Sequence, residues 1–198
     1  MFNFKSAAAI GLSIILSASG VMPAAAALVY DRSSGTWVDE AQLAPRPRAG
    51  HSVIRKEIVD YETTQAPGTL VIETGERRLY LVMEDGKAMK YGIGVGRDGF
   101  TWSGTHRITR KAEWPGWTPP AAMRKRVPDL PAYMEGGPDN PLGARALYIG
   151  STLYRVHGTS EPWSIGQAVS SGCIRLTNDD VADLYERVSV GAKIIVNH

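Results

Sequence analysis

Residues 170–178 read Ser-Ser-Gly-Cys-Ile-Arg-Leu-Thr-Asn, and they follow the string His157-Gly158-Thr159. Fifteen residues, 158–172, lie between His157 and Cys173, which is enough for a loop that returns the chain beside the end of the strand carrying the histidine. Gly172 gives the chain the freedom of a tight turn directly before the cysteine. This pattern predicts that a thiol and an imidazole lie side by side at the end of a strand.

A thiol in such a position can become a nucleophile. A free thiol has a pKa of about 8.5, and the positive end of a helix together with a neighbouring imidazole can lower that pKa by about one unit or more. A helix is expected to begin about four residues after Cys173, and His157 is the candidate imidazole. Cys173 is the only cysteine, so it cannot form an intrachain disulfide. An inert core cysteine or a bridge between two chains are the competing interpretations.

Residues 1–27 have the features of a secretory signal peptide. A short segment with Lys5 leads into the apolar stretch 7–16 and then into small residues that end with four alanines, 24–27. Serines interrupt the apolar run, which is shorter than the roughly 20 residues needed to span a membrane. We therefore expect export to the periplasm or cell envelope, with no transmembrane anchor after signal cleavage.

Composition and charge favour one ordinary globular domain. The chain has 198 residues, of which 43% are hydrophobic and 21% charged. Loss of residues 1–26 removes one cation, Lys5, so the formal charge falls from +2 to +1. Such a balance lacks the basic face that phosphate binding requires and excludes nucleic acid as a partner. The irregular, Pro- and Arg-containing residues 28–66 are expected to be an N-terminal extension or linker.

The remainder, residues 67–197, is predicted to be a mainly β domain. Its first three runs of β-forming residues are separated by the turn signals Thr74-Gly75-Glu76 and Glu84-Asp85-Gly86-Lys87, which is typical of an antiparallel meander. The predicted strands cover residues 69–73, 78–82, 88–93, 106–111, 146–149, 153–156 and 193–196.

One helix and one long loop complete the expected domain. The helix begins at Thr177 or Asn178, has apolar residues at helical spacing and ends at Gly191. Residues 112–143 are too long and too rich in proline and glycine for a plain connection. They are either a lid over a functional site or a loop that its tryptophans pack onto the sheet.

The string from His157 to Thr159, followed by residues 170–178, resembles the signature of the YkuD-type L,D-transpeptidase family, which includes the ErfK and YbiS proteins. Its usual form is His-Gly, a spacer, and Ser-His-Gly-Cys-Ile/Val-Arg-Leu/Met with an asparagine shortly after. Ser171 stands where many members carry a second histidine. The resemblance covers residues 67–196 and implies a YkuD-like antiparallel β-sandwich with one helix after the cysteine loop.

This resemblance implies an enzyme of cell-wall biogenesis and cell shape that acts on peptidoglycan stem tetrapeptides without a cofactor or metal. The Cys173 thiolate attacks the bond between meso-diaminopimelate and D-alanine, D-alanine leaves, and a thioester remains on the enzyme. An amine then takes the acyl group. The acceptor stays open: a neighbouring stem, which gives a 3-3 cross-link, an envelope protein, or a D-amino acid. Transfer to water would make the enzyme an L,D-carboxypeptidase.

The resemblance also assigns roles around the nucleophile. His157 is the base that takes the thiol proton and later the proton of the attacking amine. No side chain follows it that could orient its ring, so the carbonyl of Gly158 is expected to do so. The backbone N–H groups of Ser171, Gly172 and Cys173 are the expected donors to the oxyanion.

Three further residues of the motif receive supporting roles. Arg175 either holds a substrate carboxylate with its planar guanidinium or forms an internal salt bridge, and the two interpretations have equal weight. Ser170 is expected to brace the turn by hydrogen bonds, and Asn178 is expected to cap the helix.

Three alternatives compete with this interpretation. Papain-like and NlpC/P60-type wall peptidases place the cysteine before the histidine, the reverse of the order here. Structural zinc needs four ligands, and His51, His106 and His198 show no pairing with the cysteine. A non-catalytic wall-binding module of the same fold would have no need for both a thiol and an imidazole in one string.

Overall fold

The computed structural model describes residues 28–31, 36–39 and 54–198. The predicted signal peptide lies outside the described residues, as do residues 32–35 and 40–53 of the predicted linker. At the start of the described part, strand β1 (Leu28–Asp31) pairs antiparallel with β2 (Thr36–Asp39). None of the helices in the described ranges has the length and apolar character needed to span a bilayer.

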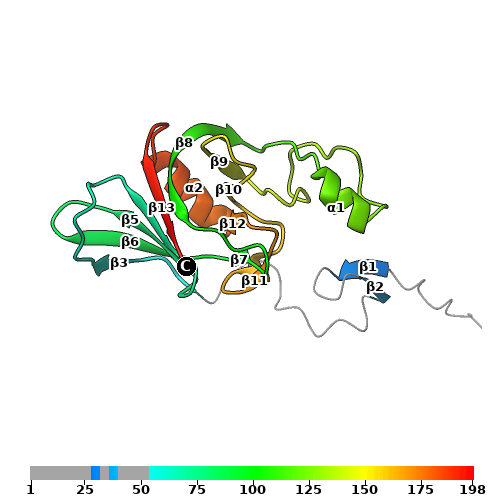
Figure 1. The fold of residues 1–198 in the computed structure, drawn as a ribbon, viewed down its shortest axis with the longest axis horizontal. Coiled ribbons are helices and arrows are strands. Elements are labelled where there is room, and N and C mark those ends of the chain that lie inside the picture. The colour runs from blue at the N-terminus through cyan, green and yellow to red at the C-terminus, as the bar shows by residue number, and fades with distance from the viewer. Residues whose placement is uncertain (1–27, 32–35, 40–53) are drawn as a thin grey trace, which may run out of the picture.

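A nine-stranded sheet in the order β12-β10-β9-β8-β13-β4-β5-β6-β3 forms the body of the molecule (Figure 1). A two-stranded parallel pair, β7 with β11, lies outside it. The expected mainly β domain is confirmed. The strands of the large sheet are β3 (Glu57–Asp60), β4 (Leu70–Glu73), β5 (Arg78–Val82), β6 (Lys87–Gly92), β8 (Gly104–Glu113), β9 (Arg145–Ile149), β10 (Arg155–His157), β12 (Ile174–Arg175) and β13 (Lys193–Asn197). The small pair consists of β7 (Val95–Gly96) and β11 (Ala168–Ser170).

Most neighbouring strands are antiparallel, and β4, β5 and β6 form the predicted meander. Two pairs in the large sheet depart from the antiparallel expectation: β13 runs parallel to β4, and β12 runs parallel to β10. Both β12 and β13 reach their places after a long connection, and only such a connection lets a strand return in the same direction as its neighbour.

Strand β13 joins the two halves of the sheet, one formed by β3, β4, β5 and β6 and the other by β8, β9, β10 and β12. The first half of β8 pairs with β13 and its second half with β9, and the register shifts between Ile108 and Arg110. A bulge of this kind bends a strand and increases its twist. The bend lets the two halves enclose a common core to which both contribute, together with the helix α2. Fully buried members of that core include Leu70, Leu79, Tyr91, Ile108, Leu147, Leu184 and Ile194.

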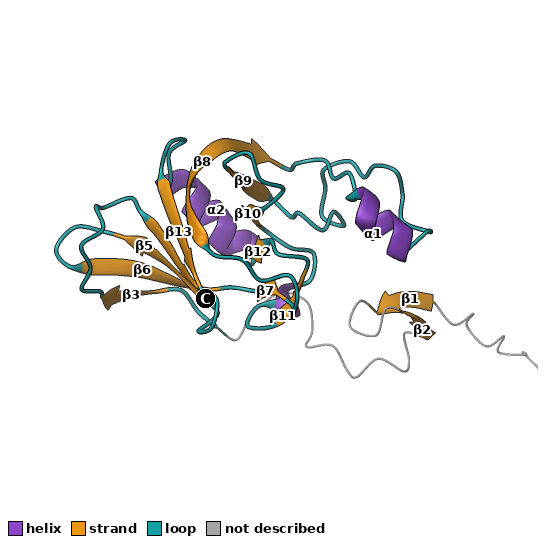
Figure 2. Ribbon diagram, viewed as in Figure 1, coloured by secondary structure: helices purple, strands orange, loops and turns teal. Residues whose placement is uncertain are grey.

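Helix α2 (Asn178–Arg187) packs against β9 and β10 through one apolar face (Figure 2). Thr177 is its N-cap, and the Thr177 hydroxyl accepts a hydrogen bond of 3.1 Å from the backbone N–H of Asp180. The helix ends earlier than predicted, because Val188 is already extended, with φ −104° and ψ 128°. Gly191 therefore belongs to the turn before β13 and does not end the helix.

Two short helical elements were not expected from the sequence. Helix α1 (Ala121–Arg126) lies inside the long stretch 112–143, and a 3-10 turn, η2 (Pro162–Ser164), follows β10. Neither is long enough to show an apolar period. Neither start carries a side-chain cap, and the one start signal is Pro162 in the first turn of η2.

The sheet also begins before residue 67. Strand β3 lies within the range 28–66, expected to be a linker, and pairs antiparallel with β6 at the edge of the sheet. Three of its four side chains are exposed, so it lacks the alternation that marks a strand. Backbone pairing with β6 holds it there, and exposed ion pairs accompany that pairing, Glu57 to Lys90 at 2.6 Å and Asp60 to Lys87 at 2.7 Å.

Candidate active site

The parallel pairing of β10 with β12 brings the motif residues together. Val156 lies opposite Ile174, and His157 lies opposite Arg175. One step back in the same register places Arg155 opposite Cys173. Side chains two residues apart in a strand share a face, so all four polar side chains project to one side. They line one cavity of about 360 Å³.

His157 is buried at the end of β10. Its Nδ1 lies 2.6 Å from the carbonyl oxygen of Gly158. A carbonyl only accepts, so Nδ1 carries the hydrogen and Nε2 is left as the acceptor. Burial, and then the positive charge of Arg175, lowers the pKa of His157 to about 3. The imidazole is therefore neutral at pH 7, with its orientation set by the backbone carbonyl of Gly158.

Cys173 is half-buried, and its Sγ lies 4.0 Å from the carbonyl oxygen of Leu153. Burial raises the pKa of the Cys173 thiol, and the charge of Arg155 acts in the opposite direction with a smaller effect. The expected lowering of this pKa by a helix end is wrong. Strand β12 separates the cysteine from α2, which begins at Asn178, and the effect of a helix end falls off within one turn.

Hydrogen bonds of Ser170 brace the turn that carries Cys173. Ser170 Oγ donates to the carbonyl oxygen of Cys173 at 2.6 Å and accepts from the backbone N–H of Gly172 at 3.1 Å. This N–H is thus engaged within the turn, which corrects its predicted role as a donor to the oxyanion. Within residues 54–198, the backbone N–H groups of Ser171 and Cys173 donate to no protein acceptor.

Two aromatic residues that the sequence did not single out hold this turn from outside. Trp102 Nε1 donates to the carbonyl oxygen of Gly172 at 2.7 Å, and its ring stacks on Tyr154 with 4.5 Å between centroids. Gly172 has φ +104°, and a Cβ there would lie 2.4 Å from Tyr154 Cε1. Glycine is therefore required by both the backbone angle and the close approach of the ring.

Arg175 forms an internal salt bridge. Its Nη1 lies 3.1 Å from Glu161 Oε2, and the guanidinium is largely buried. Its backbone exchanges two hydrogen bonds of 2.9 Å with Gly94. Of the two interpretations that the sequence left open, the structure shows the salt bridge.

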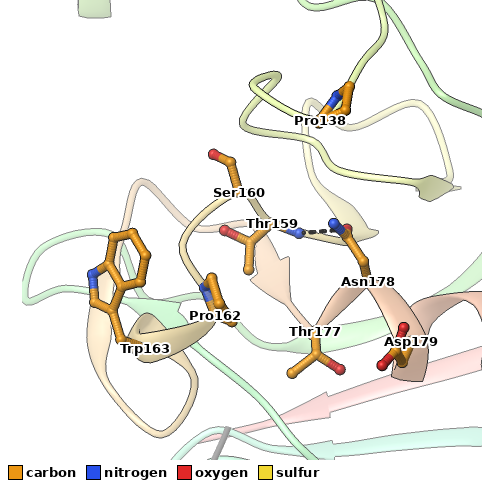
Figure 3. Close-up of a pocket in the computed structure, with 8 residues that line it drawn as sticks. All are labelled: Pro138, Thr159, Ser160, Pro162, Trp163, Thr177, Asn178 and Asp179. Atoms are coloured by element: carbon orange, nitrogen blue, oxygen red, sulfur yellow. Dashed lines mark hydrogen bonds between the residues drawn. The ribbon is translucent and has the colours of Figure 1, made fainter. Parts of the chain in front are cut away.

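Asn178 does not cap the helix, a role that Thr177 takes. The Asn178 Oδ1 accepts instead from the backbone N–H of Ala144 at 2.9 Å and of Thr159 at 3.2 Å, the second of which is drawn in Figure 3. A Cβ on Gly158 would lie 2.3 Å from that oxygen. The asparagine thus ties the segment after His157, and the end of the long loop, to the start of α2.

A second, smaller cavity of about 230 Å³ lies beside this contact, and both Thr159 and Asn178 line it (Figure 3). It shares no lining residue with the cavity that contains Cys173. Its lining residues are Pro138, Thr159, Ser160, Pro162, Trp163, Thr177, Asn178 and Asp179.

The long stretch 112–143 supplies the apolar wall of the cavity that contains Cys173. The lining residues from this stretch are Trp117, Pro120, Ala122, Met123, Pro141 and Leu142. Trp117 is buried and exchanges two backbone hydrogen bonds of 2.8 Å with Met134, which closes the base of the loop. Trp114 is exposed, with 44% of its surface accessible.

The site has the composition of an acyl-transfer centre. Among the described residues, His, Cys, Asp and Glu side chains form no group of three or more that could hold a metal ion. The cavity instead contains a thiol and a neutral imidazole beside an apolar wall, and the turn at Cys173 has two backbone N–H groups without a protein acceptor among residues 54–198. This set can transfer a proton, form a covalent bond and stabilise an oxyanion.

Comparison with known proteins agrees with this chemistry. The family model "YkuD: L,D-transpeptidase catalytic domain" matches residues 67–196. The Escherichia coli K12 protein named "Probable L,D-transpeptidase ErfK/SrfK" is 42% identical over 134 residues, which cover 63% of this chain and 42% of that protein. The chain thus spans less than half the length of this relative.

Solved structures show the same fold. A Brucella melitensis crystal structure is 43% identical with a TM-score of 0.51, covering 72% of this chain and 92% of that one. It is named "Probable carnitine operon oxidoreductase caia", in contrast to the transpeptidase names. L,D-transpeptidase 3 from Mycobacterium tuberculosis is 19% identical with a TM-score of 0.51, covering 66% and 60%. By its matched residues, the chain belongs to the YkuD family of L,D-transpeptidase catalytic domains.

Proposed function

We propose that this chain is an L,D-transpeptidase that acts on peptidoglycan stem tetrapeptides. The observation that carries the proposal is the shared cavity of Cys173 and His157, in which the imidazole is neutral and Nε2 is its unprotonated nitrogen. A neutral base beside a protonated thiol is the arrangement that general-base activation requires.

In the first half of the proposed reaction, His157 Nε2 takes the thiol proton as Sγ attacks the carbonyl of the third stem residue. The backbone N–H groups of Ser171 and Cys173 stabilise the oxyanion. When the intermediate collapses, the C–N bond breaks and the proton passes from His157 to the amine of the leaving D-alanine. A thioester on Cys173 remains.

In the second half, an amine attacks the thioester and His157 accepts its proton. The C–S bond breaks, and the same proton restores the thiol. A stem diaminopimelate, an amine of an envelope protein or a D-amino acid would each complete this step. The apolar wall formed by residues 112–143 favours transfer by limiting the access of water to the thioester. The proposed location is the periplasm or cell envelope, where the reaction would contribute to wall biogenesis and cell shape.

Purified protein and a tetrapeptide-containing muropeptide test this proposal. We expect release of D-alanine, a covalent acyl adduct on the intact protein, and cross-linked, exchanged or trimmed products in mass spectra. Cys173→Ala should abolish all three, because Cys173 carries the only thiol of the chain and the hydroxyl groups in this cavity are much weaker nucleophiles. Binding of muropeptide without release of D-alanine would instead favour a non-catalytic wall-binding module.

A further inference from the structure

We propose that Arg155 binds the terminal carboxylate of the donor peptide. The sequence alone makes Arg175 a candidate for this contact. The inference rests on the proposed function, because the carboxylate belongs to the residue that leaves when Cys173 is acylated. It assigns a specificity role to a residue outside the motif strings.

Arg175 is unsuited to this role because its guanidinium is already paired with a carboxylate of the protein. The guanidinium is largely buried and paired with Glu161 at 3.1 Å. Removing a buried cation from its carboxylate leaves an uncompensated charge on both sides. A substrate carboxylate would therefore have to displace Glu161 before it could pair with Arg175.

Arg155, in contrast, has no carboxylate partner among the described residues. Within residues 54–198 it forms no ion pair, and its buried Nε has no hydrogen-bond partner. Its guanidinium carbon lies 5.3 Å from the centroid of the Tyr148 ring, on the neighbouring strand. This contact supports the planar group without neutralising it. A cation that lies in a cavity without a carboxylate partner can bind an anion.

The placement of Arg155 fits the chemistry of the donor. It lies opposite Cys173 in the register of β10 and β12, on strands about 4.8 Å apart. In the donor, one Cα separates the terminal carboxylate from the nitrogen of the bond to be broken. A substrate with its reacting carbonyl at Sγ can thus place that carboxylate near the neighbouring strand. No Asp or Glu is among the described residues that line the cavity, so nothing there competes for the guanidinium.

The first test uses two small thiol reagents and needs no transpeptidase activity. Iodoacetate and iodoacetamide both lose iodide as Sγ forms a C–S bond, but only the first carries a carboxylate. Both consume the same thiolate, so a change in thiol pKa cancels in the ratio of their rates. We expect Arg155→Met to lower the ratio of iodoacetate to iodoacetamide labelling by about tenfold, the range for a charge-assisted hydrogen bond. Arg155→Lys should retain part of it.

Arg110→Met is the matched control. Arg110 is exposed and lies 3.6 Å from the same Tyr148 ring, but it does not line the cavity. Its substitution should leave the ratio unchanged, and thermal melting should show that all three variants are folded. An unchanged ratio in folded Arg155→Met would overturn the proposed carboxylate site whether or not the protein is a transpeptidase.

The second test compares a tetrapeptide donor that ends in a carboxylate with the same donor ending in an amide. Wild-type protein should prefer the acid in kcat/KM, and Arg155→Met should lose this preference, mainly through KM. A preference that survives in Arg155→Met would place the substrate carboxylate elsewhere. Failure of the wild type to release D-alanine from either donor would count against the proposed function, while the reagent ratio would still decide the carboxylate site.

Discussion

Among single residues, the reacting pair is uncharged before substrate binds. The pKa of His157 is lowered to about 3 and the pKa of Cys173 is raised, so thiol and imidazole both stay neutral around pH 7. The thiolate fraction then grows as pH rises, and His157 contributes no step above pH 5. We expect the rate of iodoacetamide labelling of the free protein to climb from pH 6 to pH 9 without a plateau. A fast, pH-independent rate near pH 6 would indicate a preformed thiolate and imidazolium pair.

Ser171 and His157 separate two accounts of proton transfer. If His157 alone moves the protons, Ser171 contributes only its backbone N–H, which every L-residue other than proline provides. Ser171→Ala should keep D-alanine release within about tenfold, whereas His157→Ala should lose about two orders of magnitude or more. Both are measured on a tetrapeptide donor at neutral pH. Equal loss in two folded variants would place the serine hydroxyl in the proton path.

The motif strings singled out Cys173 and His157, which the structure places in one cavity, but they did not single out every residue around that pair. Cys173 and His157 are recognisable because local spacing and neighbouring glycines mark them. Trp102, Tyr154 and Arg155 carry no local mark, because their roles come from ring stacking and strand register across distant parts of the chain. The sequence also could not predict the raised pKa of the Cys173 thiol, because that shift depends on burial.

Among the elements, the loop that contains α1 has the clearest testable role. Trp117 and Met134 already form a hydrogen-bonded base, so residues 118–133 can be replaced by a short Gly-Ser link across that pair. This change removes part of the apolar wall and should raise hydrolysis relative to amine transfer. Product ratios from one muropeptide mixture provide the measurement. Lys125→Ser, an exposed change that leaves the wall intact, is the control. An unchanged ratio in the shortened protein would reduce the loop to a packing element.

The elements that sequence patterns missed are those held by contacts rather than by their own periodicity. Strand β3 shows no alternation because it lies at an exposed edge, and α1 is a single short helix after two prolines. Asn178 has the side chain of a helix cap, but its Oδ1 binds two loops instead. Thr177 could be chosen as the cap only once its extended backbone was known.

For the whole molecule, β13 is the strand on which both halves depend. It pairs with β4 on one side and β8 on the other, and its Ile194 and Val196 are buried. Each such side chain contributes about 1.5–3 kcal/mol, and domains are stable by only about 5–15 kcal/mol. Removal of residues 193–198 should therefore abolish the cooperative melting transition in circular dichroism. Removal of His198 alone, which contacts Thr74 at 3.1 Å, should leave that transition in place. Cooperative melting without β13 would show that the halves fold independently.

The sequence predicted a strand at this position but not its place in the middle of the sheet, because strand order follows from contacts between distant segments. Local alternation shows that residues 193–196 are β-forming. It cannot show that they lie between residues 70–73 and 104–107, parallel to one and antiparallel to the other.

The central place of β13 also sets the order in which the strands of the sheet can pair as the chain is synthesised. Asn197 bonds to Glu73, 124 positions earlier in the chain, so the meander leaves the ribosome long before its partner strand exists. Contacts of such separation close slowly. Until residues 193–197 arrive, the two halves of the sheet have no common strand, and Cys173 is already present in an open chain. A chain that completes its sheet so late stays unfolded for longer, and an unfolded chain is the form that can be translocated across a membrane.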